Sequence, residues 1–257
     1  MCKLPKISKG LYMKILLAPS ETKKSGGEFK KIQLDSFEFS NKEKLYVSNL
    51  YNDFLKSATD EELSKLFGIK KVSDLESYKN IDLFNDPTMK AIERYTGVAY
   101  DYLDYPTLND EQKEFIDNNL IIFSNIFGAL KSCEEIPNYK LKQAEKIDGF
   151  KIESYYKEHT SDELDRYFEG ELLIDLRAGF YDKFYTPKVP YITMKFIKGG
   201  KVVSHWAKAY RGKITRELAK YQPQTEKELN EIEFKNLFIK EILSVKNKKE
   251  YVFEIKE

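Results

Sequence analysis

The sequence predicts a single compact domain of mixed α/β (α+β) class, with a partly antiparallel mixed sheet and surrounding helices. The chain has 257 residues, enough to bury one sizeable hydrophobic core. Apolar runs typical of strands interleave with helical stretches, but without the strict alternation of a doubly wound sheet. No internal repeat, heptad array or low-complexity linker marks off a second unit. We therefore expect one domain over residues 13–257.

The first 12 residues, MCKLPKISKGLY, are expected to lie outside this domain. They lack the apolar segment of a signal peptide, and a second methionine, Met13, follows them directly and opens the sequence MKILLAPSETK. We interpret Met13 as the natural start and residues 1–12 as a non-native or disordered extension.

Five segments have the composition of β-structure. Four are short, largely apolar runs, and the fifth is a hairpin in which Gly199 and Gly200 separate two β-rich arms. The segments are 14–19 (KILLAP), 119–124 (NLIIFS), 171–176 (ELLIDL), 191–206 (the hairpin) and 250–255 (EYVFEI). The sequence NIFGAL, which follows the second of these, is expected to form a turn.

Helices are expected over much of residues 40–120 and again over residues 204–222. Thr59-x-x-Glu62 and Ser73-x-x-Glu76 both have the spacing of a capping box, which closes the start of a helix. Gly68 lies where the first of these two helices should end. The region therefore predicts two short helices on either side of the sequence FGIKKV.

Composition excludes several classes of protein. Hydrophobic residues at 41% and aromatic residues at 14% exclude a disordered chain, and a net charge of +1 does not suggest a globally basic nucleic-acid binder. No apolar run is long enough to cross a membrane. The chain has two cysteines and two histidines, too few for a disulfide framework or for a zinc or iron site of the ordinary kind. A magnesium site made of carboxylates alone stays open. We expect a cytoplasmic protein with no cofactor.

The charges are unevenly distributed along the chain. Between Pro187 and Lys220 there are nine Lys or Arg residues and one acidic residue, whereas Asp101 to Leu120 carries six Asp or Glu residues and one Lys. This asymmetry predicts a positive region on an otherwise balanced surface.

The expected helix 204–222 concentrates part of this positive charge. At about 100° per residue, its apolar side chains form one stripe and its basic side chains fan across the opposite side, with Gly212 between Lys208 and Arg216. A glycine costs about 1 kcal/mol of helix propensity relative to alanine, so a close approach to its backbone is expected. Either a neighbouring chain segment packs there and the charges face water, or the basic face binds an anion such as phosphate.

Five segments, in this order, resemble the YaaA family of peroxide stress proteins. They are MKILLAPSETK, AIERYTGVAYDYLD, LIIFSNIFGALKSCEEIPNYKLK, GELLIDLRAGFYDKF and FIKGGKVVSHWAKAYRGKITREL. The resemblance spans roughly residues 13–220. It departs from the common family pattern at Asn125 and at Ser132-Cys133, where a second glycine and an arginine-proline pair are more usual, so Cys133 is interpreted as a local substitution.

The resemblance implies a bacterial cytoplasmic protein that protects against hydrogen peroxide and limits free iron and hence oxidative DNA damage. It also implies a cantaloupe-like α/β fold with a positively charged cleft, a helix-hairpin-helix element and DNA binding. Mapped onto this chain, the helix-hairpin-helix corresponds to residues 59–80. Such hairpins present backbone N–H groups to phosphates and need no strong local charge.

Two sets of candidate site residues follow. If the strands ending near Pro19, Ser124 and Leu176 are neighbours, the polar residues after them meet at one edge of the sheet. The candidates for binding nucleic-acid phosphate are Lys208, Arg211, Gly212, Arg216, Arg177, Lys23, Lys140, Gly68, Lys70 and Lys71. The candidates for lining a pocket are Ser20, Glu21, Tyr95, Gly97, Tyr100, Asn125 and Tyr139, although most of the chain's 18 tyrosines should simply pack in the core.

Two main hypotheses for function stay open at this point. The first is binding of double-stranded or distorted DNA through phosphate contacts in a basic cleft. The second is an enzyme that acts on a nucleotide or nucleobase, including one in damaged DNA, with no catalytic residue assigned. A third, an interaction with another protein that affects iron indirectly, has no specific motif. A pocket deep enough for one base, with Glu21 or Tyr95 at its floor, would favour the enzyme, and a shallow groove would favour simple binding.

Overall fold

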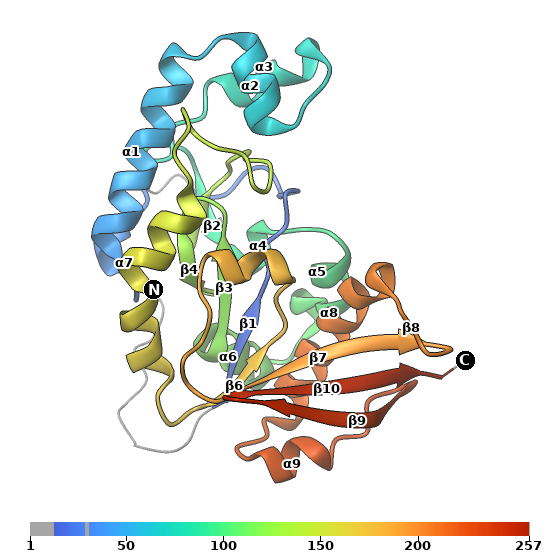
Figure 1. Ribbon diagram of the computed structural model, residues 1–257. Coiled ribbons are helices and arrows are strands. Elements are labelled where there is room, and N and C mark those ends of the chain that lie inside the picture. The colour runs from blue at the N-terminus through green and yellow to red at the C-terminus, as the bar shows by residue number, and fades with distance from the viewer. Residues whose placement is uncertain (1–12, 29–30, 257) are drawn as a thin grey trace.

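The computed structural model describes residues 13–28 and 31–256, and the expected extension at residues 1–12 lies outside them. One large mixed sheet runs through the molecule (Figure 1) in the order β4-β3-β1-β6-β7-β10-β9, with β8 paired to β7. Its strands are β1 (Met13–Leu17), β3 (Leu120–Ser124), β4 (Gly128–Lys131), β6 (Leu172–Asp175), β7 (Tyr191–Lys198), β8 (Lys201–Val202), β9 (Leu237–Val245) and β10 (Lys248–Ile255). A separate pair joins β2 (Thr88–Lys90) and β5 (Glu135–Pro137).

The centre of the sheet is parallel and its edges are antiparallel. Strand β1 pairs in parallel with both β3 and β6, β6 pairs in parallel with β7, and β7 pairs in parallel with β10. Antiparallel pairs add β4, β8 and β9. The prediction of a partly antiparallel mixed α/β sheet is therefore confirmed.

The central strands form where the sequence is largely apolar. Every residue of β1 and β3 is buried, as expected of strands covered on both faces. The prediction of a turn over NIFGAL was wrong beyond its first residues, because the chain turns at Asn125 to Phe127 and then returns as β4 beside β3. Gly128 opens this strand with φ +60°, a conformation that favours glycine.

The helices lie around this sheet. They are α1 (Asn41–Ser57), α2 (Asp60–Phe67), α3 (Val72–Lys79), α4 (Ala91–Arg94), α5 (Val98–Leu103), α6 (Asp110–Asn119), α7 (Ile152–Phe168), α8 (Ser204–Tyr221) and α9 (Glu226–Asn230). Three short 3₁₀ turns complete them, η1 (Leu34–Ser36), η2 (Tyr105–Thr107) and η3 (Gly179–Lys183). Helix α6 packs on β1, β3 and β4, and α8 contacts α5, α6 and β7. Helix α8 begins at Ser204, where a helix was predicted, so the second arm of the predicted hairpin 191–206 is shorter than expected and ends at Val202.

Helices α2 and α3 form where two capped helices are predicted, but only one capping box exists. The Thr59 side chain accepts a hydrogen bond from the backbone N–H of Glu62, and the Glu62 carboxylate accepts one from the backbone N–H of Thr59. Gly68 ends α2 with φ +67°, as predicted. The second box was wrong, because α3 begins at Val72 and Ser73 lies inside it.

The α2–α3 pair lies at the far end of α1 and well apart from α8 (Figure 1). Segment 139–149 connects this pair to the rest of the molecule. The backbone N–H of Lys142 donates to the carbonyl of Leu66, and the Lys142 side chain lies against Gly68. The candidates in the predicted helix-hairpin-helix are thus separated in space from those on α8.

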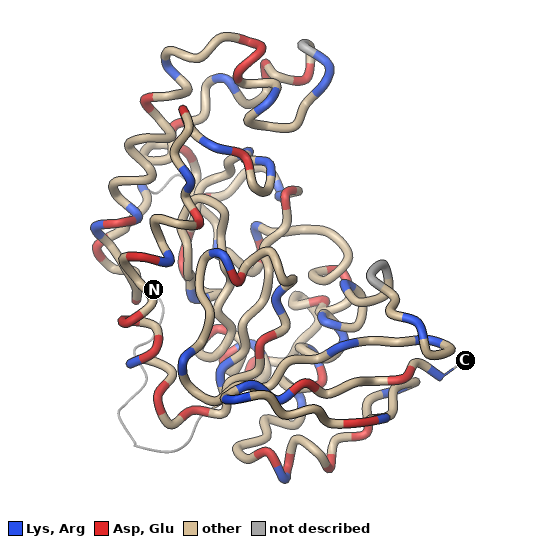
Figure 2. The backbone as a smooth tube through the Cα atoms, in the orientation of Figure 1, with Lys and Arg blue, Asp and Glu red and all other residues tan. Residues whose placement is uncertain are grey.

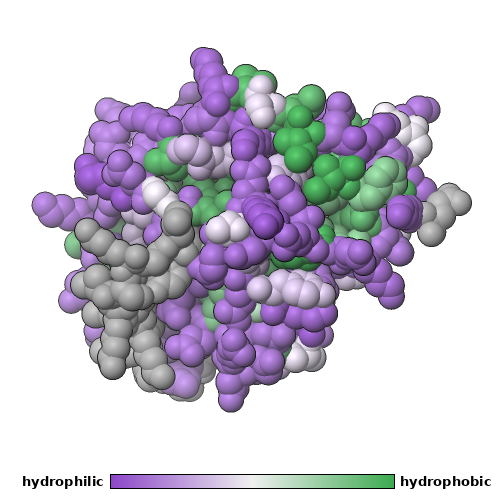
Figure 3. Space-filling view, turned by 90° about the horizontal axis from the view of Figure 1, so that it is seen from below, coloured by the Kyte–Doolittle hydropathy of each residue, from purple (hydrophilic) through white to green (hydrophobic). Residues whose placement is uncertain are grey.

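The C-terminal edge of the sheet exposes apolar surface. Among the described strands β9 pairs with β10 alone. Its exposed apolar residues are Phe238, Ile239, Ile242, Leu243 and Val245. Figure 3, seen from below, shows apolar surface gathered on the side where β9 and β10 lie. Within residues 13–28 and 31–256, no helix is long and apolar enough to cross a membrane.

The two candidate caps give a direct test of these assignments. Thr59→Ala removes the acceptor for the Glu62 N–H and should lower the free energy of unfolding by about 1 kcal/mol. Ser73→Ala removes an exposed hydroxyl inside a helix and should change it by less than about 0.5 kcal/mol. Urea-induced unfolding of both variants measures the difference, and equal losses would contradict the assignment of one capping box.

Candidate functional site

Two adjoining hollows lie at the carboxyl ends of β1 and β6. One is lined by residues 17–22, at and after the end of β1, and has a volume of about 500 Å³; we call it the β1 hollow. The other is lined by residues 193–196 of β7 and has a volume of about 470 Å³; we call it the β7 hollow. Ala178, Lys208 and Arg211 line both, so these residues form the wall between them. We call the two hollows together the α8 cleft. Their volumes fall within the range of small-molecule sites.

The register of the parallel strands explains why these segments meet. Ile15 of β1 lies between Leu120 of β3 and Ile174 of β6, so the three strands end at the same edge of the sheet. The loops that follow β1 and β6 therefore emerge side by side, as they do at the ligand sites of open α/β sheets. The predicted convergence at this edge is correct.

The loop after β6 is held by a buried ion pair. Both oxygens of the Asp175 carboxylate accept hydrogen bonds from the Arg177 guanidinium, at 2.9 Å from Nε and 2.7 Å from Nη2. The same guanidinium donates to the carbonyl oxygens of Tyr181 and Tyr185. The Arg177 side chain is 1% exposed, so its role is to hold this loop, and the prediction that it binds phosphate does not fit its position.

Helix α8 presents two basic residues without an ionic partner. No ion pair or hydrogen bond of the side chains of Lys208 and Arg211 occurs within the part of the chain that the structure describes, and both line the α8 cleft. Burial lowers the pKa of Arg211, and the negative charge of Asp175 partly offsets this decrease. These two candidates are therefore placed to bind an anion. Figure 2 shows that the basic residues of β7, β8 and α8 lie toward the same end of the sheet.

Two other candidates on α8 hold the helix against α5. Gly212 is buried against the backbone of Ala99, where a Cβ atom would overlap the carbonyl oxygen. The Arg216 guanidinium donates to the carbonyl oxygens of Leu103 and Asp104, at 2.8 and 3.0 Å, where α5 ends. Both were predicted to bind phosphate, but a neighbouring chain segment occupies each of them. Part of the acidic segment 101–120 is thus packed against the basic helix.

The β1 hollow contains four of the predicted pocket residues. They are Ser20, Glu21, Gly97 and Tyr100. The Glu21 carboxylate accepts from the backbone N–H of Gln143 at 3.0 Å, and the Tyr100 hydroxyl donates to the carbonyl of Ala18 at 2.9 Å. Gly97 has φ +104°, which favours glycine.

Lys23, Tyr95 and Tyr139 lie together behind this hollow and do not line it. The Lys23 ammonium is 3.8 Å from the centre of the Tyr139 ring and 5.2 Å from that of Tyr95, and it donates to the carbonyl of Ser20 at 3.2 Å. The two phenol hydroxyls are 2.8 Å apart, and Ser124 Oγ is 2.8 Å from that of Tyr139. Burial, aided by the charge of Lys140, lowers the pKa of Lys23 to about 7. Lys23 therefore supports the hollow from behind, and its burial holds the pKa of its ammonium below that of an exposed lysine.

The remaining candidates lie outside the α8 cleft. Asn125 is buried, and its side-chain oxygen accepts from the Tyr181 hydroxyl at 3.1 Å. The carbonyl of Lys140 accepts from the Tyr51 hydroxyl at 2.8 Å. Gly68, Lys70 and Lys71 are exposed on the α2–α3 turn. The structure thus brings together the candidates in the loop after β1, those at α5 and those on α8, but not those of the α2–α3 turn.

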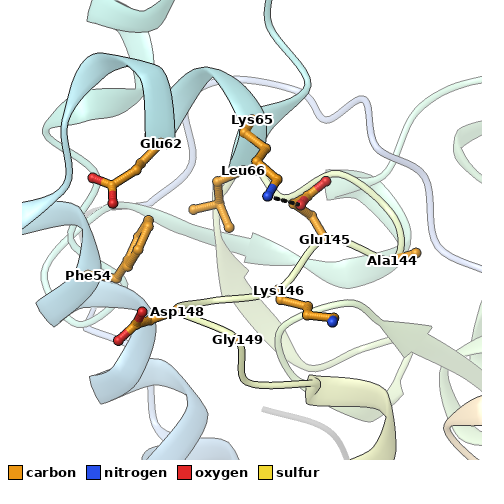
Figure 4. Close-up of a pocket in the computed structure, with 9 residues that line it drawn as sticks. All are labelled: Phe54, Glu62, Lys65, Leu66, Ala144, Glu145, Lys146, Asp148 and Gly149. Carbon is orange, nitrogen blue, oxygen red and sulfur yellow. Dashed lines mark ion pairs between the residues drawn. The ribbon is translucent and has the colours of Figure 1, made fainter.

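A third hollow, of about 550 Å³, lies between α1, α2 and segment 144–149 (Figure 4). Three acidic and two basic side chains line it, and Lys65 and Glu145 form an ion pair of 3.8 Å. Figure 4 shows the Lys65 and Glu145 side chains pointing toward each other across it. None of the predicted site residues lines this hollow, and its acidic excess does not suit an anion.

Sequence reasoning missed several residues of the β7 hollow. Asp175, Asp182, Thr193 and Lys248 line it. Asp175 lies next to the end of the predicted strand 171–176, and that position was a signal for the site. Thr193 gave no such signal, because a threonine on a strand is common. In the described ranges 13–28 and 31–256, no group of three or more His, Cys, Asp or Glu side chains is placed to hold a metal ion.

Comparisons with known proteins point to one family. The family described as "Peroxide stress protein YaaA" matches residues 13–243. An uncharacterized protein of Campylobacter jejuni is 45% identical over 95% of this chain and 99% of its own length. UPF0246 proteins of Corynebacterium efficiens and Corynebacterium glutamicum are 33% and 34% identical, each over 80% of this chain and 85% of their own length.

The contact between Gly212 and Ala99 predicts the effect of adding one methyl group. Gly212→Ala should lower the free energy of unfolding by about 1–3 kcal/mol, because overlap with a carbonyl outweighs the gain in helix propensity. The matched control is Gly179→Ala, where nothing lies within 4 Å of the added atom and where little change or a slight gain is expected. Chemical denaturation of both variants tests this, and a stabilised Gly212→Ala would contradict the packing.

The lowered pKa of Lys23 predicts how stability depends on pH. The unfolded chain holds the proton up to a pKa near 10.5 and the folded chain only up to about 7. Between these values the unfolded state binds more protons, so the stability of the wild type relative to Lys23→Met should rise with pH. Urea unfolding of both proteins at pH 7 and pH 9.5 measures this, and a difference that does not change with pH would refute it.

Proposed function

This chain belongs to the YaaA family of peroxide stress proteins, and we propose that it acts in the cytoplasm by binding DNA through phosphate contacts in the α8 cleft. The observation that carries the proposal is the pair Lys208 and Arg211. Both line the cleft and have no ionic partner within the described residues, whereas the neighbouring Arg177 and Arg216 are engaged by the protein itself.

Phosphate contacts of this kind favour binding without sequence preference. A lysine ammonium and an arginine guanidinium interact with the backbone of any sequence, and base identity is read by other contacts. We expect the α8 cleft, at the end of the sheet, to bind double-stranded or distorted DNA. We expect the exposed α2–α3 turn, with Gly68, Lys70 and Lys71, to give a second contact to the backbone.

Binding at phosphates offers a physical link to iron. Cations gather around the DNA backbone, and a protein that neutralises phosphates releases them. Ferrous iron displaced from the backbone would generate its oxidants farther from the DNA. We therefore propose that the protein limits iron-dependent oxidative damage at the DNA itself.

A second candidate function, an enzyme acting on a nucleotide or nucleobase, is favoured by the shape of the cleft. The β1 hollow is a discrete cavity of about 500 Å³ with Glu21 on its wall, and the lysine of lowered pKa, Lys23, lies behind it. Tyr95, expected at the floor, does not line it. Chromatography of nucleotides and oligonucleotides after incubation with the protein distinguishes turnover from binding.

The DNA-binding proposal predicts a specific change in salt dependence. Each phosphate contact contributes about 0.9 to the slope of log K against log salt concentration. Lys208→Gln combined with Arg211→Gln should therefore reduce the slope by about 1.8 and weaken binding equally across sequences. Fluorescence anisotropy with labelled duplexes over a range of salt concentrations measures both quantities.

The matched control is Lys213→Gln combined with Lys220→Gln, which removes the same charge from the same helix outside the α8 cleft. This control should keep nearly all of the wild-type slope. If both double variants reduce the slope equally, binding depends on the overall positive charge and not on the α8 cleft. That result would reject the cleft as the binding site.

A further inference from the structure

The β7 hollow contains more polar groups than contacts to a continuous DNA backbone would use. We propose that it binds a phosphomonoester, the terminal phosphate of a nucleotide or of a nucleic-acid strand. This inference rests on the proposed role of Lys208 and Arg211 in binding phosphate. It adds that the protein selects a phosphomonoester and that this group binds in the β7 hollow.

Two hydrogen-bonding groups of this hollow have no partner. Arg211 Nε and Thr193 Oγ1 are both buried and unpaired within the described part of the chain, and both residues line the β7 hollow. Leaving such a group unpaired costs about 1–3 kcal/mol. Each can donate a hydrogen bond, and an oxygen of a ligand bound against it would accept that bond. Two unmet donors indicate a ligand that offers several acceptors, as a phosphate does.

Thr193 and Arg211 are brought to one place by the sheet. Thr193 of β7 is paired with Asp175 of β6, the carboxylate whose charge acts on Arg211. On the other side Thr193 is paired with Glu250 of β10. The hydroxyl therefore belongs to the sheet wall of the hollow, facing the residues that α8 contributes.

The charge of the hollow matches a phosphomonoester better than a phosphodiester. Five basic and three acidic side chains line it, a net of about +2. Asp175 is paired with Arg177, and Asp182 lies 3.9 Å from the same guanidinium. Glu250 is paired with Lys248, so Lys195, Lys208 and Arg211 are the basic side chains of the hollow without an ionic partner among the described residues. Asp182 is 63% exposed and can turn toward water. A phosphomonoester carries about −1.5 to −2 at pH 7, whereas a phosphodiester in the backbone carries about −1.

The neighbouring β1 hollow provides room for the rest of the ligand. It shares Ala178, Lys208 and Arg211 with the β7 hollow, so a phosphate held at Arg211 adjoins it directly. Its wall includes the buried aromatic residues Tyr100 and Tyr181. A nucleoside attached to the bound phosphate therefore fits there, with the ester bond at the wall between the hollows.

The test compares a nucleoside monophosphate with its nucleoside alone and with phosphate alone. Isothermal titration calorimetry with thymidine monophosphate, thymidine and inorganic phosphate should show binding of the first and third and none of thymidine. Thr193→Val keeps the shape of the side chain and removes the hydroxyl, and it should weaken binding of thymidine monophosphate by about tenfold. Lys213→Gln, on the same helix but outside the hollow, should leave the affinity unchanged.

Covalently closed circular DNA separates this inference from the proposed function, because it has no strand ends. Wild type and Thr193→Val should bind it equally. If the protein binds circular DNA but not thymidine monophosphate, the inference is overturned and the proposed function stays intact. The same holds if Thr193→Val does not weaken binding of thymidine monophosphate. Binding of thymidine monophosphate without binding of circular DNA would support the phosphomonoester site and reject the proposed DNA function. Circular dichroism confirms that each variant is folded.

Discussion

Strand β1 pairs in parallel with β3 on one side and with β6 on the other, and the position of the α8 cleft depends on this pairing. Parallel strands end at the same edge, so the loops after them meet there. The ion pair of Arg177 with Asp175 then holds the loop after β6 in place, buried almost completely. Removing one partner of such a pair typically costs about 3–5 kcal/mol, because the other charge stays buried without compensation. The cleft wall at Ala178 therefore rests on a rigid support.

Helix α8 divides its polar residues between packing and binding. Gly212 lets the helix approach the backbone of Ala99, and Arg216 closes the end of α5 through its carbonyl groups. These contacts fix the helix at the edge of the sheet. Lys208 and Arg211, on the same helix, line the cleft without ionic partners in the described ranges. The basic side chains of the helix thus have two roles: Arg216 holds the helix against α5, and Lys208 and Arg211 are placed to bind a ligand.

Sequence patterns predicted the central strands because those strands are largely apolar and bounded by turns, as β1 and β3 illustrate. Strands such as β4 and β9 were missed because they are short or exposed at an edge, where composition carries little information. Among the site residues, sequence could not separate Arg177 from Arg211. Both are arginines near predicted element ends, and only the fold determines which of them meets a carboxylate. Thr193 was out of reach for the same reason, since its unpaired hydroxyl is a property of its surroundings.

The central claim is that a phosphate-bearing ligand binds at the wall between the two hollows. It is tested most directly by nuclear magnetic resonance of the ¹⁵N-labelled protein, including the Arg side-chain Nε–H groups, during titration with a short oligonucleotide. The account predicts that the Arg211 Nε–H resonance and the backbone amides of residues 20–22, 97–100 and 178–179 shift together. Shifts confined to residues 68–71, or spread over the surface without change at Arg211, would contradict it.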